Sequence, residues 1–567
     1  MRGHTGFALP ALPLLCLMAL TTPAAFAGNS VPDWVIQSAQ SAQSAPGAAP
    51  FYPANTQALV LLDDRLVTVG PDGRDTERFR RVLKILRPQG REYAKIVAHY
   101  SKDEKLDYFH AWSIAPDGHQ YTVKDQDVHD QSLGEWGILY DDLRGKIVTP
   151  AGADPGGVIA YEVQRHVAGY GTQEQSWDFQ QDLPVTRSIL EIDLPSNWSY
   201  YAAWLHHEAA PPSEVGSNRL RWELHNIAAV DLTDVPMAPS PYALAASMVV
   251  HYGAQTLPSG DQRWTEIGNW YETLASGRTE APLEIAVKAR QVAPSQEFKG
   301  KIQGIAGFMQ REIRYVGIEI GVGGLQPHPA VDVFRYRYGD CKDKVTLLIA
   351  MLNAVGVRAT WVLVDTDRGV IDPALPSIRG NHAIAAIEMP AGYRDPDLRA
   401  VVTARTGRQY LIFDPTDTYT PIGLLRSNLQ GSYGILVAGN DSQVIQLPTL
   451  SPDADVVDRT ASFVLTANGT LKGTVTEARF GEAARRYRRL YNEEGEKEQN
   501  EDMARRLQTD FSSFTVESNT AQNAGEMNKS VVLKFSFTAN AYAQPSGDLL
   551  LVRPRVLGRD ARPFHAD

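Results

Sequence analysis

Residues 336–344 read Tyr-Arg-Tyr-Gly-Asp-Cys-Lys-Asp-Lys, and they open a strongly helical segment of the chain. Behind them, apolar residues recur at helical spacing: Val345, Leu348, Ile349 and Leu352. Asp340 is suited to the N-cap position, because its carboxylate can accept a hydrogen bond from an unpaired N–H of the first turn. Gly356 is suited to the position just after the last turn. We therefore predict a helix over residues 341–355 that begins at Cys341.

Cys341 would lie in the first turn of this helix. Unpaired backbone N–H groups and the positive end of the helix dipole favour the thiolate over the thiol at that position. Lys342 and Lys344 would act in the same direction if they lie near the sulfur, whereas Asp340 and Asp343 would oppose them. The local pattern predicts a nucleophile, and the alternative is a buried cysteine that only packs.

A thiolate that cleaves amides also needs a proton donor and a group that holds this donor in one tautomer. His382 stands at the start of an apolar strand over residues 383–387, and Asp414 directly follows a strand over residues 409–413. If the two strands are antiparallel neighbours, both side chains can reach the start of the helix. Taken alone, each residue is more often structural. Their order and placement together predict a catalytic triad of Cys341, His382 and Asp414.

The sequence around this helix predicts an α+β core over residues 260–445. Upstream of the helix, four apolar residues form a helical stripe: Ile302, Ile305, Met309 and Ile313. Downstream of it, residues 357–364, 383–387 and 409–413 have the apolar runs of strands. This order of elements favours one helix packed against an antiparallel sheet.

Two further domains flank the core. Residues 58–250 hold short apolar or alternating runs separated by turns such as Pro-Asp-Gly at 71–73, which predicts an antiparallel β-sandwich. Residues 455–567 combine a hairpin signal, Asn-Gly at 468–469, with a polar helix over 482–507, which predicts a C-terminal α+β domain. The predicted fold class is therefore α+β and multidomain.

The first 27 residues have the features of a secretory signal peptide. A basic residue, Arg2, precedes an uncharged apolar run over residues 7–20, and Ala-Phe-Ala at 25–27 provides a cleavage motif. Residues 28–57 are rich in small residues and proline, which predicts a linker. We therefore expect an exported protein, with the periplasm as its location.

Composition and charge exclude several classes of function. The 567-residue chain has a formal net charge of −11, and nucleic-acid binding is not expected because phosphate contacts need clustered Lys and Arg. No stretch after the signal reaches about 18 apolar residues, so no transmembrane helix is expected in the mature chain. His328 could form a metal site together with Cys341 and His382, but no Cys-x-x-Cys or His-Glu-x-x-His spacing occurs, so we expect neither a metal nor another cofactor. Without the signal, Cys341 is the sole cysteine and cannot form an internal disulfide.

Three stretches resemble a known family: residues 314–319, 328–330 and 337–344. They are similar to the transglutaminase-like cysteine hydrolases and acyltransferases, whose geometry is papain-like. The similarity is greatest to a bacterial subgroup of exported proteins that carry an N-terminal β-rich domain of unknown function ahead of the transglutaminase-like core. The resemblance covers residues 58–439. It implies that residues 260–445 hold a helical lead-in and this core.

The resemblance gives Cys341, His382 and Asp414 the roles of nucleophile, proton donor and orienting acid. It implies attack on an amide or peptide carbonyl and a thioester intermediate. Water as the acceptor would make a peptidase or deamidase, and an amine would make a transglutaminase; the sequence leaves both open. The expected substrate is a protein or peptide, with cell-envelope proteins as candidates. The Cys341 N–H is the first expected donor to the oxyanion, and Gln326 is the candidate for the second.

One alternative belongs to another class of protein. A chain can keep this fold without using its thiol, so a non-catalytic binding or scaffold protein of the cell envelope is the rival hypothesis. Proteins similar to this one often continue into a further β region. The domain that begins near residue 455 is therefore expected to be incomplete.

Overall fold

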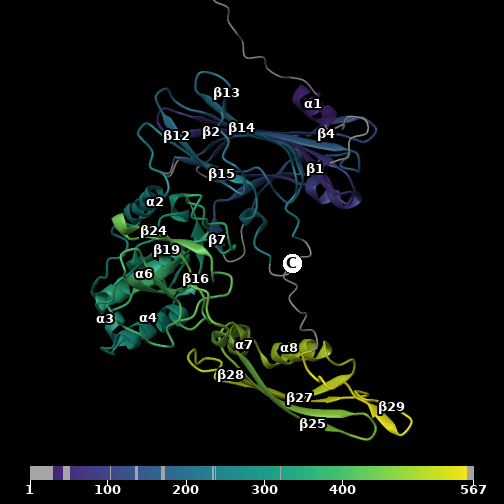
Figure 1. Cartoon of the computed structure of the whole chain (residues 1–567), viewed down its shortest axis with the longest axis vertical. Helices are drawn as coiled ribbons and strands as arrows, with labels where there is room; N and C mark the ends of the chain where they lie inside the picture. Colours follow the sequence, from purple (N-terminus) through teal and green to yellow (C-terminus); the bar gives the residue numbers. More distant parts are fainter. Residues whose placement is uncertain are drawn as a thin grey trace, which may run out of the picture.

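The computed structural model describes residues 30–41, 51–101, 104–133, 138–167, 173–232, 235, 238–319 and 321–558. The signal peptide expected at residues 1–27 lies outside these ranges. Figure 1 shows three parts stacked along the long axis: a β-rich N-terminal domain, a core that holds helices around a sheet, and a C-terminal sheet with two helices. This arrangement confirms the predicted α+β multidomain fold class. Within the described ranges, no helix is both long enough and apolar enough to cross a membrane.

The N-terminal domain is built on an eight-stranded sheet in the order β13-β14-β11-β1-β2-β9-β4-β5. Neighbouring strands pair antiparallel, except that β1 and β11 pair in parallel. The strands are β1 (Ala58–Val69), β2 (Asp75–Ile85), β4 (Lys105–Ile114), β5 (Gln120–Thr122), β9 (Val158–Val167), β11 (Val185–Asp193), β13 (Ser213–Glu214) and β14 (Arg219–Ile227).

Two three-stranded sheets cover one face of this large sheet. Val67 of β1 packs with Val250 of β15, and Val60 of β1 packs with Ile96 of β3. These layers form the β-sandwich that the strand pattern predicted, with one parallel pair that it did not predict. The covering strands are β10 (Glu174–Asp178), β15 (Ser247–Gly253) and β12 (Ser199–Leu205) in one sheet, and β3 (Ile96–Tyr100), β8 (Arg144–Val148) and β6 (His129–Ser132) in the other.

A helix, α1 (Asp33–Ser41), packs on the opposite face of the large sheet. Its Val35 is fully buried in one cluster with Leu59. Residues 58–62 are therefore covered on both faces of the sheet, by α1 on one side and by the small sheets on the other. A strand that is covered on both faces is apolar on both, which explains the continuous apolar run. The linker predicted over residues 28–57 therefore does not hold for α1. The small residues of that stretch gave no clear helical pattern, so this short helix was not predicted.

The core packs helices α2 to α6 around a six-stranded antiparallel sheet in the order β21-β22-β20-β19-β23-β24. Helix α6 (Cys341–Ala354) runs through its centre and contacts α3, α4, α5, β19 and β20. It begins at the predicted residue. The other elements are α2 (Asp261–Leu274), α3 (Leu283–Val292), α4 (Phe298–Glu312), α5 (Ala330–Tyr336), β19 (Ala359–Val364), β20 (His382–Glu388), β21 (Val401–Thr403), β22 (Gln409–Phe413), β23 (Tyr433–Leu436) and β24 (Gln443–Gln446).

The C-terminal domain is a four-stranded antiparallel sheet in the order β25-β26-β28-β27, with α7 and α8 on one face. β25 and β26 form the predicted hairpin, and Gly469 in its turn has a φ of +81°. The single helix predicted over 482–507 is two helices, because Glu494 and Gly495 adopt extended backbone between them. The elements are β25 (Val457–Leu465), β26 (Leu471–Arg479), α7 (Glu482–Glu493), α8 (Glu496–Gln508), β27 (Phe514–Gln522) and β28 (Val531–Ala539), followed by a small hairpin of β29 (Gln544–Ser546) and β30 (Leu549–Leu551).

Candidate active site

The Cys341 thiol lies at the start of α6, where two carboxylates cap the helix. Asp340 accepts the N–H of Asp343 at 3.2 Å, and Asp343 accepts the N–H of Asp340 at 3.3 Å. This reciprocal pair is a capping box, and Asp340 occupies the N-cap. The N–H of Cys341, at the first helical position, has no partner within the helix.

His328 fixes Asp343 from outside the helix. The His328 backbone N–H donates to one carboxylate oxygen of Asp343 at 2.7 Å, and its Nδ1 lies 3.0 Å from the other. The hydrogen bond and the charge of Asp343 raise the pKa of His328 above its ordinary value. His328 therefore supports the start of the helix. Among the described residues, no group of three or more His, Cys, Asp and Glu side chains is arranged to hold a metal ion.

Lys342 and Lys344 are buried, and each has a structural partner. Burial works against the charge of Lys342, but the Asp340 carboxylate that accepts its hydrogen bond outweighs burial and raises its pKa. Lys344 Nζ donates to the carbonyl of Ile313 at 2.7 Å. Burial lowers the pKa of Lys344 to about 8 even though the charge of Asp414 opposes this shift. Both ammonium groups thus serve the packing of α6.

His382 and Asp414 meet at one end of the core sheet. β20 begins at His382, and the pairing of Ala385 with Phe413 brings the end of β22 beside it. His382 Nε2 lies 3.0 Å from Asp414 Oδ2. The other carboxylate oxygen accepts the N–H and the hydroxyl of Thr416 at 2.9 and 2.6 Å. The Asp414 carboxylate is therefore held in one orientation, with one oxygen on the imidazole.

The charges of this pair support each other. Burial works to lower the pKa of His382, but the charge and hydrogen bond of Asp414, and a hydrogen bond with the Cys341 side chain, raise it to about 10. Burial works to raise the pKa of Asp414, but the charge of His382 lowers it to about 2. At neutral pH the pair is therefore an imidazolium and a carboxylate. Because Nε2 contacts Asp414, Nδ1 is the ring nitrogen that remains for the sulfur.

Cys341 and His382 line one cavity of about 420 Å³. The structure thus brings together the three residues of the triad predicted from the sequence, two in the wall of a cavity and Asp414 behind them. Aromatic and apolar side chains make up much of the rest of the wall. The other lining residues are Trp270, Tyr271, Tyr315, Gly324, Leu325, Lys342, Leu363, Ile378, Gly380, Asn381 and Ala383.

Gln326 is not one of the residues that line this cavity. Its side-chain amide donates to the carbonyl of Leu274 at 2.8 Å, and its amide oxygen accepts from Arg278 at 2.9 Å. Both ends of the amide are committed to the packing of the loop against the end of α2. This arrangement does not fit the oxyanion role that the sequence suggested for Gln326.

The N-terminal domain holds part of the cavity wall. Residues 373–381, here called the wall segment, lead into His382 and supply three of the lining residues. Three contacts tie the wall segment to the N-terminal domain: Ile378 N–H to Glu174 at 2.9 Å, Arg379 to Asp178 at 2.6 Å, and His251 Nε2 to the Pro376 carbonyl at 2.9 Å. No local motif marks these residues, because their partners are distant in the sequence.

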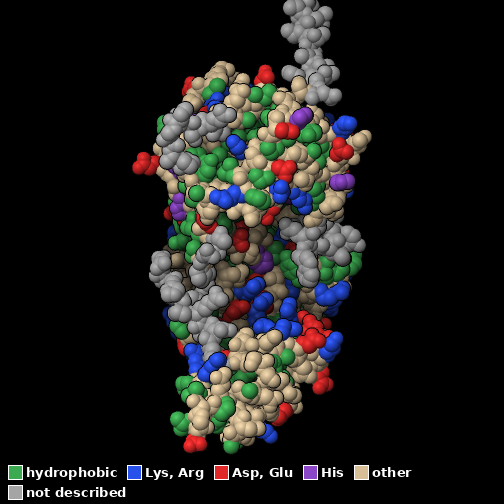
Figure 2. All heavy atoms as spheres, turned by 90° about the vertical axis from the view of Figure 1, so that its right-hand side faces the viewer, with side chains coloured by type: hydrophobic (Ala, Val, Ile, Leu, Met, Phe, Trp, Pro, Cys, Tyr) green, Lys and Arg blue, Asp and Glu red, His purple; other side chains and the backbone are tan. Residues whose placement is uncertain are grey.

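The C-terminal domain contacts the loop that follows Asp414. Arg485 of α7 donates to the buried carboxylate of Asp417 at 2.7 Å, and Tyr419 donates to Glu493 of α7 at 2.8 Å. Together with the contacts of the wall segment, these bonds mean that both flanking domains contact segments adjacent to the triad. Figure 2 shows Lys and Arg side chains gathered on the face of the molecule above the C-terminal domain.

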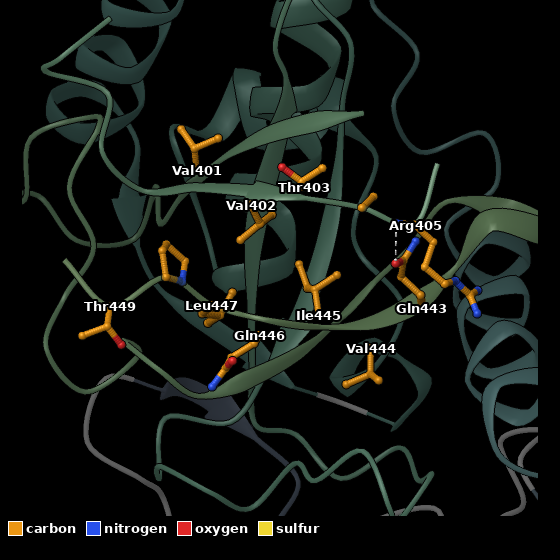
Figure 3. Close-up of a pocket in the computed structure, with 12 residues that line it drawn as sticks. Val401, Val402, Thr403, Arg405, Gln443, Val444, Ile445, Gln446, Leu447 and Thr449 are labelled. Carbon is orange, nitrogen blue, oxygen red and sulfur yellow. Dashed lines mark hydrogen bonds between the residues drawn. The ribbon is translucent and has the colours of Figure 1, made fainter. Parts of the chain in front are cut away.

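A second cavity, of about 530 Å³, lies between the two edge strands of the core sheet, β21 and β24 (Figure 3). Its lining residues are 401–405 and 443–449. The Arg405 N–H donates to Gln443 Oε1 at 3.0 Å across it. The lining contains no Cys, His, Asp or Glu. The chemistry is therefore assigned to the cavity at Cys341, although that one is smaller.

Two family models match this chain. Residues 71–231 match a Domain of Unknown Function (DUF3857), and residues 285–415 match the Transglutaminase-like superfamily. The second match includes all three residues of the predicted triad. In sequence order, the chain therefore has a DUF3857 domain, a transglutaminase-like core and a further C-terminal domain. No curated protein shows a significant match to the sequence.

A solved structure shares this fold. The chain is similar to a protein of Parabacteroides distasonis titled a "putative protease", with 12% identity and a TM-score of 0.52 over 85% of this chain and 93% of the other. A "putative cysteine protease" from Cytophaga hutchinsonii has 10% identity and a TM-score of 0.16 over 60% of this chain and 75% of the other. At these identities the first likeness establishes the shared fold, and the second is too weak to support an argument.

Proposed function

We propose that this protein is a thiol acyl-transfer enzyme that acts on amide or peptide bonds. Cys341 is the nucleophile, His382 donates and accepts the proton, and Asp414 orients the imidazole. One observation carries the proposal: a cysteine at a helix start shares a cavity with a histidine whose Nε2 lies 3.0 Å from a buried carboxylate. Cysteine hydrolases of the papain type use a thiol, an imidazole and a group that orients the imidazole in this relationship. The superfamily match supports the proposal, because it spans all three residues.

In the first half-reaction, the Cys341 thiolate attacks the carbonyl carbon, and the π electron pair of the carbonyl moves to its oxygen. When the C=O bond re-forms, the C–N bond breaks. The leaving nitrogen takes the proton from Nδ1 of His382 and departs as an amine or as ammonia. The products are a thioester on Cys341 and a neutral imidazole.

In the second half-reaction, water or an amine attacks the thioester carbonyl, and Nδ1 of His382 takes the proton that this nucleophile loses. The C–S bond breaks, and the thiolate and imidazolium return. Water as acceptor gives a peptidase or a deamidase, and an amine gives a transglutaminase. Asp414 stays ionised throughout and stabilises the imidazolium at the beginning and at the end of the cycle.

The proposed substrate is a protein or peptide of the cell envelope. This assignment depends on export, which the signal features of residues 1–27 support. The single thiol of the mature chain is compatible with export, because Cys341 has no second cysteine with which to form an internal disulfide in an oxidising compartment.

Acylation by p-nitrophenyl acetate tests the proposal, because this activated ester needs the nucleophile but no specific peptide. We expect a burst of p-nitrophenolate together with one acetyl group on the peptide that contains Cys341. Cys341→Ala should abolish both signals, and His382→Ala should slow the burst about 10²-fold. His207→Ala, which changes an exposed histidine of the N-terminal domain, should react like the wild type.

The experiment separates a wrong triad from a protein without thiol chemistry. Acetylation of Cys341 whose rate does not depend on His382 would contradict the triad, and a wild type that is not acetylated would favour the scaffold alternative. Putrescine added after the burst identifies the acceptor. Release of acetylputrescine indicates a transglutaminase, and release of acetate alone indicates a hydrolase.

A further inference from the structure

Tyr271, on the buried face of α2, has a hydroxyl for which the described part of the chain offers no hydrogen-bond partner. The side chain is 4% exposed and lines the same cavity as Cys341 and His382. A buried hydroxyl without a partner costs free energy, and native proteins leave few of them unsatisfied. A hydroxyl that stands unused beside a nucleophile is therefore a candidate for a group that bonds only to a reacting molecule.

The ring of Tyr271 is held rigidly. It packs edge-on against Trp361, with ring centroids 5.9 Å apart and planes at 73°. Helix α2 is anchored to the core, because the Thr265 hydroxyl donates to the carbonyl of Ser442 at 3.0 Å. Gly268, on the same buried face, lies so close to Ser442 that a Cβ there would be 2.2 Å from its Cβ. A donor fixed on such a helix needs no reorganisation when charge develops nearby.

Two other polar side chains of the cavity already have partners. Asn381 donates to the Thr366 hydroxyl at 3.1 Å and accepts the Thr366 N–H at 2.9 Å. Lys342 donates to Asp340. These donors are committed to the structure of the wall, whereas the O–H of Tyr271 has no partner among the described residues.

The Tyr271 hydroxyl also remains a donor over the whole neutral range. Burial raises its pKa well above 10, and the charges of Cys341, Asp340 and Asp343 add to this shift. The group therefore keeps its hydrogen while the thiolate beside it carries charge. A neutral O–H that is held in a fixed position is suited to stabilise an oxyanion.

We propose that Tyr271 is a catalytic residue that donates its O–H to the oxyanion formed on the substrate carbonyl. This inference rests on the proposed function. When sulfur bonds to the carbonyl carbon, the π electron pair moves to the oxygen, which then accepts hydrogen bonds from the Cys341 N–H and the Tyr271 O–H. No proton is transferred. When the C=O bond re-forms and the leaving group departs, Tyr271 keeps its hydrogen.

Two reactions of the same thiol test the assignment in Tyr271→Phe. Acylation by p-nitrophenyl acetate passes through an oxyanion, whereas alkylation by iodoacetamide does not. We expect the acylation rate to fall about 10²-fold or more and the alkylation rate to stay within about twofold of the wild type. Tyr410→Phe is the matched control, because Tyr410 is buried in the same core cluster but does not line the cavity. It should leave both rates unchanged.

Three results would overturn the assignment. An unchanged acylation rate in Tyr271→Phe would show that the hydroxyl is not a donor in the reaction. An equal fall in both rates would show that Tyr271 acts on the thiol or on the fold. A wild type that is alkylated with the help of His382 but never acylated would refute the proposed function itself, and the Tyr271 role with it.

Discussion

Glu174 of the N-terminal domain accepts the backbone N–H of Ile378 at 2.9 Å, in the wall segment that leads into His382. Glu174 lies on β10, within the DUF3857 match, whereas Ile378 lies within the transglutaminase-like match. The lining residues of the cavity all belong to the core, and the N-terminal domain contacts the wall segment from outside. The domain of unknown function thus contacts the segment that directly precedes His382.

Glu174→Ala is expected to loosen the wall segment. The change leaves the Ile378 N–H unpaired and removes a partner of Arg263. Because a small displacement of a reacting group is costly, the acylation rate of Cys341 should fall about tenfold. Glu174→Gln keeps an acceptor oxygen and should retain most of the rate. Equal rates in the wild type and Glu174→Ala, measured with p-nitrophenyl acetate, would show that the wall segment does not depend on this contact.

Asp414→Asn should change how stability depends on pH. The pKa of His382 is raised from 6.5 to about 10, so its stabilising contribution is full below pH 6.5 and is lost as pH rises toward 10. The pKa of Asp414 is lowered from 3.8 to about 2, so its contribution is full above pH 3.8 and is lost as pH falls toward 2.

The ion pair therefore stabilises the protein most between pH 3.8 and 6.5. Thermal unfolding of the wild type and Asp414→Asn should show the largest difference in Tm in this window and smaller differences at about pH 3 and about pH 9.5. A difference in Tm that is the same at every pH would mean that the two residues do not form an ion pair.

Arg485→Ala tests the contact of the C-terminal domain with the loop behind Asp414. The change leaves the buried carboxylate of Asp417 with Arg426 as its remaining Arg partner, at 3.4 Å. The loop should become less ordered, and acylation of Cys341 should slow about threefold. Arg505→Ala, on the exposed side of α8, is the control and should have no effect on the rate. If both variants match the wild type, the C-terminal domain does not support the site.

Asp340 should contribute to stability through two separable effects. Asp340→Ala removes the N-cap of α6 and leaves the buried ammonium of Lys342 without its partner, so the free energy of unfolding should fall by about 3 kcal/mol or more. Asp340→Asn retains a capping oxygen but not the charge. Its free energy of unfolding should therefore lie between those of the wild type and Asp340→Ala. Urea unfolding followed by circular dichroism measures both. Identical losses in the two variants would assign the whole effect to the ion pair.

The sequence predicted the parts of the site whose signals are local. Asp340 and Gly356 mark the ends of α6, and apolar runs mark the strand that begins at His382 and the strand that Asp414 follows. The neighbouring positions of these strands follow from the antiparallel order of a small sheet. The triad could therefore be assembled from short segments.

The remaining features depend on contacts that are distant in the sequence. Gln326 follows two glycines and looked like a loop donor, but Arg278 and Leu274 bind both ends of its amide. Tyr271 gave no signal, because an apolar helical face does not show which hydroxyl will face a cavity. Helix α1 was not predicted because small residues and prolines dominate residues 28–57, and the burial of Val35 depends on a sheet formed by residues later in the chain.

The pairing of Cys341 with His382 is tested most directly by the rate of iodoacetamide alkylation against pH, followed by intact-mass spectrometry. An unassisted thiol reacts in proportion to its thiolate fraction, which falls about tenfold per pH unit below about 8.5. We predict that the wild type reacts at about pH 6 within a few fold of its rate at about pH 8, and that His382→Ala loses about 10²-fold at the lower pH. If the alkylation rate of the wild type fell about tenfold per pH unit below about 8.5, and His382→Ala showed the same rates, the Cys–His pair would be contradicted.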